Sequence, residues 1–117
     1  MRPSAFPDLS HTAHRPPRVG HGVSLVFDRA VSMDEVEGTL ELARLAAESL
    51  HGTEQVELDA AWVVDRRGRT VAVDTGTAAG RSLALIFLGY ARREFGNSAL
   101  QVFRSTTNAV RQTAGAA

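Results

Sequence analysis

The chain has 117 residues, no cysteine, and 13 acidic and 13 basic residues that give a formal net charge of zero. This length fits one compact domain and is too short for two ordinary ones. An apolar fraction of 44% with 22% charged residues excludes wholesale disorder. The lack of cysteine removes disulfides, thiolate metal sites and cysteine nucleophiles, and it fits a reducing compartment. We therefore expect a small cytoplasmic protein.

Residues 1–20 contain all four prolines and few large apolar side chains. Such a segment buries too little surface to offset its ordering entropy, so we predict a flexible Pro-rich tail over residues 1–20. It has no apolar stretch of the kind found in a secretory signal. His11, His14 and His21 are close in sequence, but no carboxylate or cysteine is placed to complete a ligand shell. We expect no metal site.

A strand is predicted over residues 23–27, followed by a helix over residues 33–51. Ser32 and Glu35 have the spacing of a capping box at the helix start. Gly52 is a suitable left-handed cap at its end. Spacings of three and four predict one buried stripe, formed by Val36, Leu40, Ala43, Ala47 and Leu50.

Residues 56–64 alternate between apolar and polar side chains, which predicts a strand with Trp62 on its buried face. Asp65 and Gly68 suit a type I turn, and residues 70–73 form the returning strand. The sequence therefore predicts a β-hairpin.

Three aspartates lie in or beside this hairpin: Asp59, Asp65 and Asp74. Paired carboxylates can perform acid–base chemistry or hold a hard cation. The turn explains Asp65, however, and a strand end explains Asp74. No serine lies in a nucleophile-elbow context either. No catalytic residue is assigned, and we lean against an enzyme.

Residues 79–95 predict a second helix with only a narrow polar face, and residues 100–103 predict the last strand. We expect residues 106–117 to fray. The apolar excess of the second helix predicts contact with a partner chain, for which the candidates are Phe87, Leu88 and Tyr90. Its apolar run from Ser82 to Ala91 is too short to span a bilayer, so no membrane association is expected.

The loop before this helix is a candidate anion or small-ligand site, formed by Gly76, Thr77, Gly80, Arg81 and Ser82. A helix that begins directly after a strand offers amides and a dipole that favour anions. A Walker loop needs four residues between its glycines and then a lysine. In this chain three residues separate Gly76 from Gly80, and the next residue is Arg81 instead of a lysine. A Walker loop is therefore not predicted. The alternative is a small-residue turn in which Thr77 caps the helix.

The charge is unevenly distributed along the chain. Residues 28–59 hold nine acids and two arginines, whereas residues 60–117 hold eight arginines and three acids. Opposed patches of this kind can guide self-association. Nucleic-acid binding would need the later arginines to form one basic face. They belong to separate predicted elements, so nucleic acid is possible but not favoured.

Residues 63–73, together with Gly89-Tyr90-Ala91-Arg92, resemble the hairpin and second helix of the GlcG/HbpS-like family of small haem-associated proteins. Roadblock-type and other profilin-like domains have a similar helix–hairpin–helix order. The resemblance implies haem as a possible cofactor. Two departures bear on that ligand: Tyr90 stands at the family's lysine-like position, and the glycine-rich second half of the family has no counterpart here.

Together these patterns predict an α+β domain over residues 21–105. Its order would be β-α-β-β-α-β, with about four strands and two helices in a profilin-like or ferredoxin-like arrangement. For function we favour a non-enzymatic interaction module that self-associates as a homo-oligomer or docks on a partner protein. A small-ligand domain, with haem as the candidate, and an arginine-mediated nucleic-acid binder are the alternatives.

Overall fold

The computed structural model describes residues 11–13 and 21–106, with the side chains of residues 21–104. Its strands are β1 (His11–Ala13), β2 (His21–Phe27), β3 (Trp62–Asp65), β4 (Thr70–Asp74) and β5 (Leu100–Thr106). Its helices are α1 (Met33–His51), α2 (Thr53–Asp59) and α3 (Ala78–Phe95), with a short 3-10 turn, η1 (Asn97–Ala99), before the last strand.

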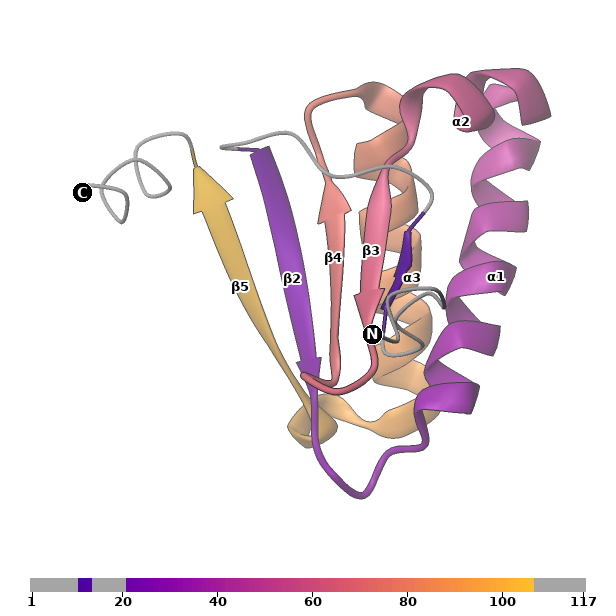
Figure 1. Ribbon diagram of the computed structural model, residues 1–117. Coiled ribbons are helices and arrows are strands. Elements are labelled where there is room, and N and C mark those ends of the chain that lie inside the picture. Colours follow the sequence, from indigo (N-terminus) through magenta and orange to yellow (C-terminus); the bar gives the residue numbers. More distant parts are fainter. Residues whose placement is uncertain (1–10, 14–20, 107–117) are drawn as a thin grey trace, which may run out of the picture.

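The strands form one sheet in the order β1-β3-β4-β2-β5, and every neighbouring pair is antiparallel. β4 therefore separates β2 from β3, which are parallel to each other and joined through α1 and α2. In the same way β2 separates β4 from β5, which are joined through α3 (Figure 1). Two interlocked split β-α-β units of this kind define the ferredoxin-like arrangement. The predicted α+β class is confirmed, and the strand order selects the ferredoxin-like alternative.

The core lies between one face of the sheet and the helices α1 and α3. Leu25, Val64 and Val71 supply its sheet side, and all three are almost fully buried. Phe27 joins the two layers, because its ring centroid lies 6.1 Å from that of Phe87 and 5.9 Å from that of Phe95. Such tilted and edge-on contacts favour aromatic pairs. The opposite face of the sheet carries Val26, Val63, Ala72 and Phe103 in the register of the strands.

The predicted first helix is confirmed at both ends, as Met33–His51. The Ser32 hydroxyl accepts a hydrogen bond from the Glu35 amide over 3.4 Å, and Gly52 has a φ of 93° where the helix ends. The buried stripe also follows the prediction, except at its last position. Leu50 is 68% exposed instead of buried.

The prediction of one strand over residues 56–64 is wrong in its first half. Residues 53–59 form the helix α2, and the strand begins only at Trp62. The positive φ of Gly52 turns the chain into this helix, and Val56 is its one buried residue. Glu, Gln and Leu are good helix formers, and the alternation that suggested a strand does not hold in space, because Leu58 is 65% exposed.

Residues 11–13 also depart from the expectation of a flexible tail over residues 1–20. They form β1, an edge strand in which His11 lies opposite Asp65 and Ala13 opposite Val63. Thr106, the first residue of the frayed end predicted over residues 106–117, is instead the last residue of β5. The rest of both predicted tails lies outside the described residues.

Candidate functional site

The loop predicted to bind an anion forms a capped start of α3. The Thr77 hydroxyl accepts a hydrogen bond from the Gly80 amide at 3.0 Å and donates one to the Asp59 carbonyl oxygen at 3.1 Å. The Gly76 amide donates to a carboxylate oxygen of Asp74 at 2.7 Å. The amides of both glycines in this turn, Gly76 and Gly80, therefore have partners within the protein. These contacts support the alternative reading, a turn in which Thr77 caps the helix.

Ser82, from the same loop prediction, contacts His51 instead. The His51 Nε2 atom lies 2.8 Å from the Ser82 Oγ atom, and this contact joins the end of α1 to the N-terminal part of α3. A serine–histidine pair is the first requirement of an activated nucleophile, but the base also needs a third group to orient it. Within the described part of the chain, His51 has no carboxylate partner. We assign the contact to helix packing.

The three aspartates near the hairpin also have structural roles. Asp65 accepts a hydrogen bond from the Gly68 amide at 2.9 Å, as its turn requires. Asp59 accepts one from Gln55 within α2. Asp74 is 2% exposed and accepts a hydrogen bond from the Gly76 amide. Among the described residues, no group of three or more histidine, aspartate or glutamate side chains could hold a metal ion.

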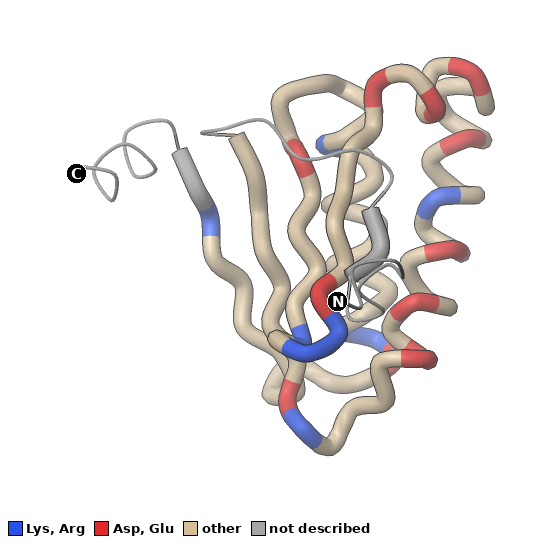
Figure 2. The backbone as a smooth tube through the Cα atoms, in the orientation of Figure 1, with Lys and Arg blue, Asp and Glu red and all other residues tan. Residues whose placement is uncertain are grey.

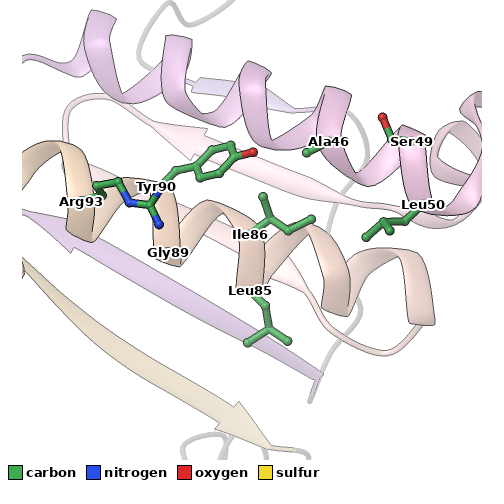
Figure 3. Close-up of a pocket in the computed structure, with 8 residues that line it drawn as sticks. All are labelled: Ala46, Ser49, Leu50, Leu85, Ile86, Gly89, Tyr90 and Arg93. Atoms are coloured by element: carbon green, nitrogen blue, oxygen red, sulfur yellow. The ribbon is translucent and has the colours of Figure 1, made fainter.

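A groove of about 400 Å³ runs along the outer side of α1 and α3 (Figure 3). The two helices are antiparallel, and the end of α1 lies at the start of α3. Tyr90 and Ile86 point from α3 toward α1, and Leu50 points back from α1 (Figure 3). The remaining lining residues are Ala46, Ser49, Leu85, Gly89 and Arg93. The groove is thus mostly apolar, with hydroxyl groups at Ser49 and Tyr90 and one arginine, Arg93, toward the C-terminal end of α3.

Exposed leucines extend this apolar surface. Leu85 is 69% exposed, and Figure 3 shows it pointing away from α1. On α1, Leu42 and Leu45 are also exposed and lie one turn before Ala46 and Ser49 on the same helix face. Single exposed leucines are ordinary, but a contiguous apolar patch with a polar rim marks an interaction surface. We call the groove and these leucines the α1/α3 surface.

The three residues that the sequence predicted to form an interface lie in different environments in the structure. Phe87 is fully buried and packs on Phe27, so it belongs to the core of its own domain and cannot contact a partner. Leu88 is partly buried against the same core. Tyr90 lines the groove. The predicted apolar excess of α3 therefore reaches the surface at Leu85, Ile86 and Tyr90.

Two of the arginines considered for nucleic-acid binding already have protein partners. Arg66 forms ion pairs with Asp34 at 2.7 Å and Glu37 at 2.9 Å, and the hydrogen bond that it donates to Asp34 raises the pKa of Arg66. The Arg69 side chain donates to backbone carbonyls of the loop after β2. Figure 2 shows basic positions on several separate elements, and acidic positions along α1. Both guanidinium groups are therefore engaged within the protein instead of facing phosphates.

A smaller hollow of about 220 Å³ lies where α1, α2 and β3 meet. It is lined by Arg44, Glu48, Val56, Glu57 and Trp62. Arg44 is paired with Glu41 and Glu48, and the hydrogen bond to Glu41 raises its pKa. Trp62 packs partly against the core, as its predicted strand face requires. Because Arg44 and Glu48 pair with each other, neither is available to pair with a charged ligand in this hollow.

Comparison with known proteins gives no relative for this fold and these surfaces: no family model, no curated protein and no solved structure matches the chain. The resemblance to the GlcG/HbpS-like family, and the haem that it implies, stay predictions. No helix in the described part of the chain is long and apolar enough to cross a membrane.

Proposed function

We propose that the chain is a non-enzymatic interaction module that docks an amphipathic helix of a partner protein along the α1/α3 surface. The observation that carries this proposal is the exposure of Leu50 and Leu85 in one groove, with Leu42 and Leu45 exposed one turn earlier on the same face of α1. Burying a leucine side chain is worth about 1.5–3 kcal/mol. A partner that covers this surface would therefore gain from several side chains at once.

The shape of the groove favours a helix as its occupant. Its lining positions on α3 run from Leu85 to Arg93. At a rise of about 1.5 Å per residue they span about 12 Å, a little more than two helical turns. A helix that lies in such a groove uses apolar anchors at positions i, i+3 or i+4, and i+7, which cover a similar length. Arg93 at one end favours a partner helix with an acidic residue there.

The proposal is tested by photo-cross-linking from position 85 in cells of the source organism. A photoreactive amino acid at Leu85 is expected to capture one partner protein. The same amino acid at Leu58, an equally exposed leucine outside the groove, serves as the control. The captured protein is then purified and its affinity measured. We expect Leu85→Lys to weaken binding at least tenfold and Leu58→Lys to change it less than twofold.

Four results would overturn the proposal. Capture could be equal from both positions, or absent from position 85. The two lysine variants could weaken binding alike. A cross-link between two copies of the chain would show that the occupant of the groove is a second copy and not a partner helix.

A further inference from the structure

The outer edge of β5 lies at one end of the sheet and is separate from the α1/α3 surface. β5 pairs with β2 over its whole length, from Leu100 opposite Phe27 to Thr106 opposite His21, without a bulge. In the part of the chain that the structure describes, no strand pairs with the other edge of β5. An edge of seven residues is long enough to template another strand.

The hydrogen bonds at the ends of the strands show which backbone groups face this edge. The Asp28 amide donates to the Ala99 carbonyl at 2.8 Å, and the Phe27 amide donates to the Arg69 carbonyl at 2.8 Å. Bonding alternates along an antiparallel pair. Residues 101, 103 and 105 therefore bond to β2, whereas the N–H and C=O groups of residues 100, 102, 104 and 106 face outward.

This edge has few of the features that normally prevent edge-to-edge pairing. Proline, bulges and several charges commonly protect an exposed edge. β5 contains no proline and one charged residue, Arg104. Phe103 is 53% exposed. It stands opposite Ser24 on the face of the sheet that α1 and α3 do not cover. β5 thus combines unpaired backbone groups with an exposed aromatic side chain.

We propose that a second copy of the chain pairs with this edge, β5 against β5, around a two-fold axis at Phe103. In this register residue 102 of one copy bonds to residue 104 of the other, and both are residues whose backbone groups face outward. Phe103 lies opposite its own counterpart in a non-hydrogen-bonded pair, where side chains approach most closely. The result is one continuous antiparallel sheet across both copies.

The side chains of β5 favour this register over its neighbours. Aromatic residues directly opposite each other stabilise an antiparallel pair. Arg104 lies opposite Val102 of the second copy, so the two guanidinium groups do not face each other. An axis at Arg104 would place the two arginines directly opposite, and like charges in that position destabilise the pair. The proposal goes beyond the proposed function, because it concerns another surface and another partner.

The absence of cysteine from the sequence permits a direct test by single-cysteine variants. In the proposed register the two Cα atoms at position 103 lie about 4.5 Å apart, which a disulfide can bridge. Gln101 would lie opposite residue 105, so its two Cα atoms would be about 14 Å apart along the strands. Under mild oxidation we expect Phe103→Cys to form a covalent dimer at least tenfold faster than Gln101→Cys. Equal rates, or a faster reaction at position 102 or 104, would overturn the register.

Sedimentation of the unmodified chain tests the dimer itself, with an expected mass of twice 12.5 kDa at 100 µM. Arg104→Pro removes an outward N–H without touching the bonds to β2, and we expect it to weaken the dimer at least tenfold. Arg104→Lys keeps that N–H and should retain the dimer. Phe103→Lys, which alters only an exposed side chain, should also give a monomer.

The Leu85→Lys variant separates this proposal from the proposed function. We expect it to remain a dimer, because Leu85 lies on α3 and not on β5. A monomeric unmodified chain at 100 µM would overturn the β5 proposal and leave the α1/α3 surface unaffected. A dimer that Leu85→Lys abolishes, and Phe103→Lys does not, would overturn it as well.

Discussion

Gly80, in the first turn of α3, lies against the main chain of Asp74 at the end of β4. A Cβ atom on Gly80 would stand 2.1 Å from the Asp74 carbonyl oxygen and 3.0 Å from the Thr77 hydroxyl oxygen. The glycine therefore allows α3 to start directly on the sheet. This close packing explains the small residues of a loop that resembles a phosphate-binding turn in sequence.

The first prediction concerns this contact. Gly80→Ala should destabilise the protein by about 1–3 kcal/mol, because the close neighbour is backbone and cannot move aside cheaply. Gly38→Ala, within α1, is the control, since a Cβ atom there would have no neighbour within 4 Å. It should stabilise the protein by about 0.5–1 kcal/mol. Urea denaturation measures both, and equal effects would show that the start of α3 shifts freely.

Local sequence signals predicted α1 well and the segment after it poorly. Ser32, Glu35 and Gly52 act through contacts within a few residues, so their pattern is visible without the fold. The residues of α2 carry both an alternating pattern and good helix formers, and these signals conflict. What decides between them is the burial of Val56 alone, which depends on how the chain packs after Gly52.

The second prediction compares the two helix caps. Thr77→Ala should cost about 1–2 kcal/mol and Ser32→Ala about 0.5–1 kcal/mol. The difference is expected because the Thr77 hydroxyl makes two hydrogen bonds, of 3.0 and 3.1 Å, whereas Ser32 makes one of 3.4 Å. Thr77→Ser keeps the hydroxyl and should retain most of the stability. Thermal melts of the three variants would contradict the assignment if Ser32→Ala proved the more costly.

The third prediction concerns Arg69, which has a φ of 56°. Its guanidinium donates to the carbonyl oxygens of Phe27, Asp28 and Val31 and so links the loop before α1 to the turn between β3 and β4. Arg69→Ala should cost about 1–3 kcal/mol, as for a hydrogen bond from a charged group.

Two further variants at this turn check the reason for that loss. Arg69→Gly should cost less than Arg69→Ala, because glycine adopts a positive φ without steric strain. Arg67→Ala, at an exposed neighbouring position, should change stability by less than about 0.5 kcal/mol. Chemical denaturation measures these losses of stability. If Arg67→Ala and Arg69→Ala were equally destabilising, the charge at the turn, and not the hydrogen bonds to the loop, would stabilise the protein.

The apolar surplus of α3 could be predicted from sequence, but its location could not. Periodicity shows that the helix is apolar nearly all round, and it does not show which side meets the sheet. The contribution of α1 was missed for a related reason. Leu42 and Leu45 lie outside the regular buried stripe of α1, and they adjoin the groove only through the helix face that they share with Ala46 and Ser49.

The last prediction separates the buried side of α3 from its exposed side. Phe87→Asp should prevent folding, because it places a carboxylate in the core beside Phe27, where Phe87 is fully buried. Even Phe87→Ala should cost about 3–5 kcal/mol. Leu85→Asp, two residues away and 69% exposed, should keep its fold. Circular dichroism and urea denaturation distinguish these outcomes. If Phe87→Asp folded and Leu85→Asp did not, α3 would be rotated about its axis, and the α1/α3 surface would not exist as described.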